Sequence, residues 1–236
     1  MGKCLPTALI LCGGLATRLG PLSKNKPKAL MLVKGESVID IIINNLLVSG
    51  IKRIVLCAGH LHGQLVDKFK DSKIVQISIE NSPLGTGGAI RNALQHIEGN
   101  EFIVLNGDTI SQIDYLKVYD QHLKNNQTCT IVINKKSERF DTSCLTIQDG
   151  VVKKFNAKPK LFPTSEESYE NSGTYIFSKD KLFFDTYPSV FSIEADMLPQ
   201  FVINKSLGFF IIETLPIDIG TPERLIKANK LEPLLD

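Results

Sequence analysis

Short apolar runs alternate with amphipathic segments through the first half of this chain, and this alternation constrains the fold more than any other feature. The strand candidates are Thr7–Leu11, Arg53–Ala58, Ile74–Glu80, Phe102–Asn106 and Thr128–Asn134. Helices are predicted over Val38–Ser49, with Ser37 as N-cap and Gly50 as terminator, and over Gly88–Ile97 and Ile113–Asn125. Strands separated by helices indicate a parallel sheet with crossover helices. We therefore expect an α/β fold with a doubly wound, mostly parallel, Rossmann-like sheet.

The pattern changes after residue 135. Cys144–Ile147 and Val151–Phe155, joined by Asp149-Gly150, predict a β-hairpin, and Gly173–Phe177 and Gly208–Thr214 predict further strands. Polar residues 160–170 are predicted to form a loop, and Thr221–Leu231 a closing helix with Pro222 in its first turn. No internal repeat is visible. We interpret residues 1–236 as one domain with two halves, 1–134 and a smaller, β-rich 135–236.

Composition excludes some classes of function. The chain has 236 residues, 43% of them hydrophobic, which is enough to bury a sizeable core. Its 27 basic and 25 acidic residues are interspersed and leave a net charge of +2, so a nucleic-acid-binding platform is not expected. The five cysteines lack C-x-x-C spacing, and the four histidines share no spacing typical of metal ligands. With no secretory leader and no long apolar run, we expect reduced cysteines, no membrane contact and a cytoplasmic location.

A glycine-rich, basic loop follows the first predicted strand. It contains Gly13 and Gly14, which let the backbone turn tightly and bring its N–H groups close to an anion. Arg18 and Lys28 supply positive charge nearby. An ordinary strand-to-helix turn is the alternative explanation for two adjacent glycines. The loop matches neither the Walker pattern nor the dinucleotide-binding fingerprint, and the added charges favour a phosphate-binding loop.

Three motifs follow the carboxyl ends of predicted strands. The Gly13-Gly14 loop follows the first strand, Ser82–Gly88 the third, and Asp108 the fourth. In open α/β sheets, ligands bind beyond the carboxyl ends of the strands. The three segments are therefore expected to converge on one crevice.

Several of these segments resemble the sugar-1-phosphate nucleotidylyltransferases. Residues 13–19 and Pro27-Lys28 are similar to the family signature G-G-x-G-T-R-L followed by P-K-P, with Ala16 and Ala29 at a family glycine and proline. Further segments resemble the family in the same order: Ser82–Ile90, Asn106–Asp108, Phe155–Pro159, Asn171–Phe177 and Ile217–Glu223. The resemblance implies a GT-A-like nucleotidyltransferase fold with a nucleotide-binding half and a smaller sugar-binding lobe. It includes no appended left-handed β-helix.

The resemblance also implies roles for particular residues. Arg18, Lys28 and Asp108 would be catalytic, and Asp108 and Asp218 would hold Mg²⁺. The implied nucleotide-binding residues are Leu11, Gly13, Gly14, Thr17, Arg18, Lys28, Pro83, Gly85, Thr86 and Gly88. The implied sugar-phosphate-binding residues are Asn106, Gly107, Lys158, Asn171, Gly173 and Glu194. Ala157 stands where the family has a glutamate that faces the sugar.

Simpler explanations exist for the acidic residues. Asp108 and Asp218 could each cap a turn or a helix, a common role of aspartate. Glu194 could lie in the first turn of a helix capped by Ser192, where an acidic side chain is favourable. We hold the two interpretations of Glu194 as equal. The paired match of the two aspartates favours a metal site over capping.

The implied reaction joins a nucleoside triphosphate to a sugar 1-phosphate and releases pyrophosphate. We favour GTP with a heptose or mannose 1-phosphate, and uridylyl or thymidylyl transfer is the alternative. A regulatory subunit that binds nucleotide sugar without catalysis is an alternative of another class, suggested by Ala16, Ala29 and Ala157. A glycosyltransferase fits poorly, because Asn106 occupies the first position of a D-x-D motif. A homodimer is one assembly state that the sequence leaves open.

Overall fold

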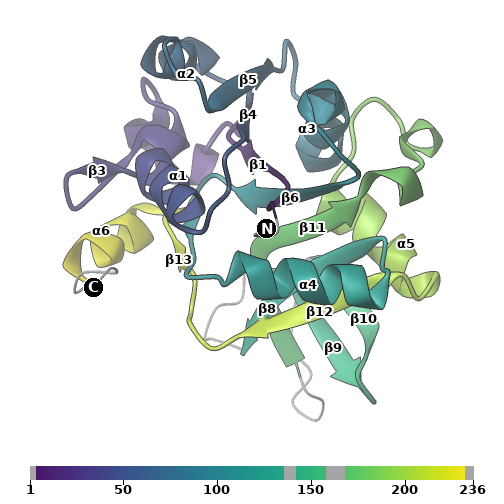
Figure 1. Ribbon diagram of the computed structural model, residues 1–236. Coiled ribbons are helices and arrows are strands. Elements are labelled where there is room, and N and C mark those ends of the chain that lie inside the picture. Colours follow the sequence, from purple (N-terminus) through teal and green to yellow (C-terminus); the bar gives the residue numbers. More distant parts are fainter. Residues whose placement is uncertain (1–3, 136–141, 158–167, 232–236) are drawn as a thin grey trace.

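The computed structural model describes residues 4–135, 142–157 and 168–231 (Figure 1). Within these residues, one nine-stranded sheet has the order β10-β9-β11-β6-β1-β4-β5, with β8 paired to β11 and β12 paired to β8. The first half contributes β1 (Thr7–Leu11), β4 (Ile54–Ala58), β5 (Val75–Ile79) and β6 (Glu101–Asn106), which pair in parallel with one another. The predicted parallel sheet is confirmed for this half.

The second half extends the same sheet with a different pattern. It contributes β9 (Cys144–Gln148), β10 (Val151–Asn156), β11 (Ser168–Ser178) and β12 (Leu207–Ile212), which pair with β8 (Cys129–Lys135) at the end of the first half or with one another. β11 runs antiparallel to β6, β8 and β9, whereas β12 is parallel to β8. β11 therefore joins the upper and lower parts of the molecule seen in Figure 1.

Helices cover both faces of the sheet, as a doubly wound fold requires. They are α1 (Val38–Val48), α2 (His62–Phe69), α3 (Gly85–Ala93), α4 (Tyr115–Asn125), α5 (Leu198–Ile203) and α6 (Pro222–Lys230). α1, α2 and α4 pack with Ala8 and Ile10 of β1 in one core. α3 and α5 pack with Leu9 of the same strand in a second core. The alternation of side chains along β1 thus separates the two apolar layers.

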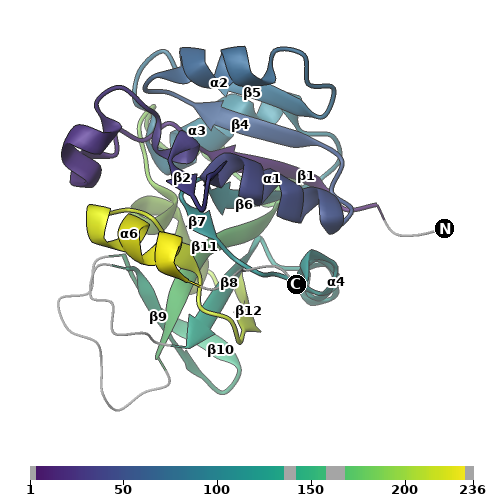
Figure 2. The same ribbon diagram turned by 90° about the vertical axis from the view of Figure 1, so that its left-hand side faces the viewer.

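Small elements bring the end of the described chain back to its beginning (Figure 2). β13 (Ile217–Asp218) pairs antiparallel with β7 (Thr109–Ile110), and β2 (Leu32–Val33) pairs with β3 (Glu36–Ser37). Asn229 of α6 accepts from the Lys34 amide at 2.8 Å and donates to the Leu32 carbonyl at 3.2 Å. These contacts place β13 and α6 beside the segment that carries Lys28.

Several predicted boundaries are confirmed and others are wrong. The Ser37 side chain caps α1, and Gly50 ends it at φ 90°. α3 begins at Gly85, three residues earlier than predicted, and ends at Ala93 before a short 3-10 turn, Leu94–His96. Residues 168–170, predicted as loop, belong to β11, because pairing with β8 and β9 overrides their weak strand propensity.

Helix α2 was not predicted at all. It is eight residues long and buries only Leu65, so it carries little of the periodic signal that reveals a helix. Across the described part of the chain, no helix has both the length and the apolar character needed to cross a membrane.

Candidate active site

The loop after β1 is shaped by its close contact with the neighbouring strands. A Cβ on Gly13 would collide with the Glu80 carboxylate and lie 3.3 Å from the Gly59 amide nitrogen, so a larger residue would have to push the Glu80 side chain aside. Ala16 adopts a left-handed conformation at φ 52°, which suits glycine better than alanine. A short 3-10 segment, Thr17–Ser23, then positions Arg18. The loop therefore keeps the conformation of a glycine-rich turn despite carrying alanine.

A cleft of about 430 Å³ lies where the segments after β1, β5 and β6 meet. We call it the nucleotide cleft. Its walls include nine of the ten predicted nucleotide-binding residues, Leu11, Gly13, Gly14, Thr17, Arg18, Lys28, Pro83, Gly85 and Thr86. Gly88 does not line the cleft: a Cβ there would lie 2.9 Å from the Ser189 carbonyl oxygen, so its absent side chain permits helix packing instead. The predicted convergence of three distant segments is confirmed.

Lys28 and Asp108 form an ion pair inside this cleft. Their side chains are 14% and 28% exposed, so water screens the charges only partly. A Cβ placed on Gly220 would lie 2.7 Å from Asp218 Oδ1, 3.2 Å from Lys28 Nζ and 3.4 Å from Arg18 Nη2. One point in the site is therefore surrounded by charged groups from three separate segments.

Main-chain pairing holds the two aspartates close to each other. Asp218 is the register partner of Thr109, and the Ile219 amide donates to the Asp108 carbonyl at 3.1 Å. Asp218 Oδ2 lies 3.4 Å from Arg224, and the Gly220 amide donates to Oδ1. The described residues contain no cluster of three or more His, Cys, Asp and Glu side chains suited to a metal. Any ion held by the two aspartates would need further ligands from phosphate oxygens or water.

A second hollow of about 290 Å³ adjoins the nucleotide cleft. We call it the polar hollow. Asn106, Asn171, Gly173 and Glu194, all predicted to bind the sugar phosphate, line it together with Ala157, Ser143 and Asp218. Gly107 lines the nucleotide cleft instead, and Lys158 lies outside the described residues.

The two hollows share a boundary. Arg18, Asn106, Asp108 and Glu194 line both, and we call these residues the shared wall. A molecule in the nucleotide cleft and another in the polar hollow would thus meet at a cationic side chain and two carboxylates. Of the charged groups here, only the Arg18 guanidinium, helped by Lys28 in the nucleotide cleft, can offset the repulsion between two polyanions, whereas the two carboxylates add negative charge.

Glu80 lies at the start of residues 80–88, the segment whose hydrogen bonds we expect to select the base, although it is not among the predicted nucleotide-binding residues. Its buried carboxylate accepts from the Leu84 amide at 3.4 Å, and burial raises its pKa above the ordinary value. It lines the nucleotide cleft at the end that the segment after β5 forms. An acidic residue at the end of a predicted apolar strand was the available signal, since such a position is seldom occupied by glutamate.

The structure supports both interpretations of Glu194. Glu194 lies in the first turn of a π-helical segment, Ile193–Met197, and the Ser192 side chain caps this segment by accepting from the Ala195 amide at 3.2 Å. Its carboxylate also lines both hollows. Capping positions the segment, and the carboxylate is thereby presented to the shared wall.

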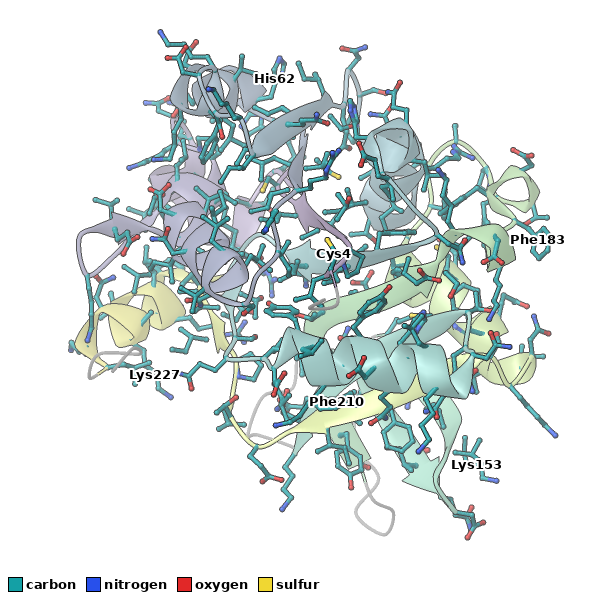
Figure 3. All side chains as sticks on the ribbon, in the orientation of Figure 1. Cys4, His62, Lys153, Phe183, Phe210 and Lys227 are labelled. Atoms are coloured by element: carbon teal, nitrogen blue, oxygen red, sulfur yellow. The ribbon has the colours of Figure 1, made fainter. Side chains whose placement is uncertain are left out.

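The segment between β11 and α5 clamps α3. The Arg91 guanidinium donates to the carbonyls of Phe184, Tyr187 and Ser189 and lies 5.2 Å from the centre of the Phe191 ring. Phe191 is buried against the glycines of α3, whereas Phe183 is 73% exposed and points outward (Figure 3). The clamp fixes the end of α3 that borders the nucleotide cleft.

Comparison with known proteins identifies the family. Residues 7–233 match the nucleotidyl transferase family model. A D-glycero-alpha-D-manno-heptose 1-phosphate guanylyltransferase from Campylobacter jejuni is 33% identical, over 92% of this chain and 95% of that protein. A mannose-1-phosphate guanyltransferase from Yarrowia lipolytica is 30% identical, over 94% of this chain and 63% of that protein. The crystal structure of HddC from Yersinia pseudotuberculosis complexed with GMP-PN is similar with a TM-score of 0.80 and 34% identity, over 96% and 99% of the two chains.

Proposed function

The chain belongs to the nucleotidyl transferase family, and we propose that it transfers a guanylyl group from GTP to a heptose or mannose 1-phosphate. The observation that carries this proposal is the shared wall: two adjoining hollows meet at Arg18, Asp108 and Glu194. The relatives described above, which act on heptose 1-phosphate and mannose 1-phosphate, support the choice of substrates. The nucleotide would occupy the cleft and the sugar phosphate the polar hollow.

The reaction needs alignment more than acid–base chemistry. A phosphate oxygen of the sugar 1-phosphate, already ionised, forms a bond to the α-phosphorus, and the bond to the bridging oxygen of the β-phosphate breaks. Pyrophosphate leaves with the electron pair. Lys28 and Arg18 would offset the charge that gathers at the α-phosphate, and the loop after β1 would hold the triphosphate.

Glu80 offers a basis for the choice of guanine. The Watson–Crick edge of guanine carries two adjacent donors, N1–H and the N2 amino group, which one carboxylate can accept side by side. Glu80 is the buried carboxylate at the β5 end of the nucleotide cleft. Adenine presents no such pair of donors at that edge, so an ionised Glu80 would disfavour ATP.

We also propose Mg²⁺ as cofactor, held by Asp108 and Asp218. Both carboxylates line the polar hollow, and the pairing of β7 and β13 holds their backbones close together, which fits the one or two carboxylates that Mg²⁺ takes from proteins. When bound, the ion would neutralise phosphate charge. Removing metal with EDTA should abolish turnover and Mg²⁺ should restore it, and Asp218→Asn should raise the Mg²⁺ concentration needed.

Pyrophosphate release tests the proposed function. The purified protein would be assayed with each of four nucleoside triphosphates against heptose, mannose, glucose and glucosamine 1-phosphates. Release with GTP and a manno-configured sugar phosphate is the expected result. Release only with UTP or dTTP would replace the guanylyl assignment. No release from any pair, with nucleotide sugars still raising the melting temperature, would favour a non-catalytic binding subunit.

The five cysteines fit a cytoplasmic location. All are free thiols, four of them buried, as expected for a protein kept in a reducing compartment. We keep the cytoplasm as the proposed location. We also propose that the protein forms a homodimer. Measuring the mass of the protein in solution would test this.

A further inference from the structure

We propose that Tyr175 is a positioning residue: its buried hydroxyl links Asn171 of the polar hollow to Glu194 of the shared wall and so couples sugar-phosphate capture to the nucleotide cleft. The inference rests on the proposed function and assigns residues that act behind the substrate-contacting surface. Tyr175 is fully buried in β11 and lines neither hollow. It therefore cannot touch substrate and must act through its neighbours.

The Tyr175 hydroxyl has a partner on each side. It donates to Glu194 Oε1 at 3.2 Å and accepts from Asn171 Nδ2 at 2.7 Å. Burial and the nearby Glu194 carboxylate raise the pKa of Tyr175, so the hydroxyl keeps its proton and its donor role. The two hydrogen bonds thus run in one direction, with Asn171 donating to Tyr175 and Tyr175 donating to Glu194.

Asn171 has little hydrogen-bonding capacity left for a substrate. Its amide nitrogen donates to Ser143 Oγ at 2.9 Å as well as to Tyr175, which uses both hydrogens. Its oxygen accepts from the Gly173 amide at 2.9 Å. We infer that Asn171 orients Ser143 and Tyr175, while Ser143 and Glu194 present their oxygens to the polar hollow.

The other oxygen of Glu194 is tied to the nucleotide side. Glu194 Oε2 accepts from Thr86 Oγ1 and from Ser192 Oγ, both at 3.0 Å. Thr86 lies in the first turn of α3, lines the nucleotide cleft and also accepts from the Ile193 amide at 2.8 Å. The Glu194 carboxylate is therefore held by Tyr175 at one oxygen and by Thr86 and Ser192 at the other, and a shift on one side changes the hydrogen bonds on the other.

Kinetics of Tyr175→Phe test the role. The substitution keeps the ring and removes only the hydroxyl, so we expect kcat/KM for the sugar 1-phosphate to fall by about tenfold to a hundredfold, as for one hydrogen bond to a charged group. The KM for GTP should rise too, but by a smaller factor, because the change reaches the nucleotide cleft only through Glu194 and Thr86. Tyr115→Phe is the matched control, since Tyr115 is also buried but lies in α4 away from both hollows.

A double-mutant cycle with Glu194→Ala separates positioning from general stability. If Tyr175 acts through Glu194, Tyr175→Phe should cost less than about twofold in the Glu194→Ala background. Equal losses in both backgrounds, or an equal loss in Tyr115→Phe, would overturn the inference. If Tyr175→Phe melts below the assay temperature, the whole cycle is measured at a temperature below that variant's melting point.

The outcomes also distinguish this inference from the proposed function. A wild-type protein that releases no pyrophosphate from any substrate pair would remove the proposed function, and the inference with it. A wild-type protein that turns over, together with a Tyr175→Phe variant of unchanged kcat/KM, would overturn the inference alone.

Discussion

The nucleotide cleft and the polar hollow are built in different ways, although they share a wall. Loops that follow the parallel strands β1, β5 and β6 form most of the cleft, so its residues lie in short contiguous motifs. The polar hollow takes single side chains from antiparallel β8 and β11 and from the segments that flank β9, β10 and β13. A loop can bind phosphate with its backbone, whereas a hollow of scattered side chains depends on how each is held. Catalysis should therefore depend on charge in the nucleotide cleft and on the exact placement of side chains in the polar hollow.

The largest expected effect is the loss of the Lys28 charge. Lys28→Ala should lower turnover by about 10²–10³, by analogy with removal of one preorganised donor to a developing anion. The ion pair of Lys28 with Asp108 places this charge inside the nucleotide cleft. Steady-state kinetics would measure it, with Lys24→Ala as control because Lys24 is exposed and outside the cleft. An unimpaired Lys28→Ala enzyme would remove the catalytic assignment.

Glu80→Gln should weaken the selection of guanine over other bases, by a smaller factor than the loss of turnover expected for Lys28→Ala. Replacing the carboxylate should cut the preference for GTP over ITP, which lacks the N2 amino group, by about tenfold to a hundredfold. Competition assays would give the ratio of kcat/KM values. Because burial raises the Glu80 pKa, the wild-type preference should also fall as pH is lowered through that raised pKa, where the carboxyl becomes protonated. Retention of the preference in Glu80→Gln would assign guanine selection elsewhere.

His122 tests the support of β11, the strand behind the polar hollow. Its ring nitrogens lie 2.8 Å from Thr130 Oγ1 and 3.0 Å from Ser178 Oγ, and burial lowers its pKa to about 4. The unfolded chain therefore binds a proton at His122 near pH 6.5, whereas the folded chain binds it only near pH 4. The contribution of His122 to the free energy of unfolding is therefore fully present above about pH 6.5 and is lost as the pH falls from there toward 4. Between pH 7 and pH 5 this should cost roughly 2 kcal/mol.

Urea unfolding at the two pH values would check the His122 prediction. His122→Gln cannot titrate and should lose less stability over this interval than the wild type. His60→Gln serves as the control for replacing a histidine, since His60 is exposed. Identical pH dependence in wild type and His122→Gln would contradict the linkage.

The smallest expected effect lies in the loop after β1. Ala16→Gly should stabilise the protein by about 1 kcal/mol or less, because relief of the left-handed strain is partly offset by the greater freedom of glycine in the unfolded chain. Ala29→Gly should do the opposite, since Ala29 is buried in the short 3-10 turn Lys28–Leu30. Denaturant midpoints would measure both. A destabilised Ala16→Gly protein would show that the loop is not strained at residue 16.

The same contrast explains what the sequence could predict. The β1 loop, the segment after β5 and Asp108 are contiguous motifs that follow apolar strands, so nine of the ten predicted nucleotide-binding residues line the cleft, Gly88 being the exception. Gly88 serves helix packing against residue 189, a long-range contact that no local pattern shows. From the sequence alone, Tyr175 would be interpreted as an ordinary aromatic residue of the hydrophobic core. Its link between Asn171 and Glu194 depends on pairing across β11 and on the placement of the π-helical segment.

Exchange of labelled pyrophosphate into GTP would show whether the guanylyl group passes directly from GTP to the sugar phosphate across the shared wall. With Mg²⁺ but without sugar phosphate or nucleotide sugar, no label should enter GTP, because no group on the protein receives the guanylyl moiety. Adding GDP-sugar should start the exchange. Label entering GTP in the absence of any sugar would require a guanylyl-enzyme intermediate and would exclude direct transfer.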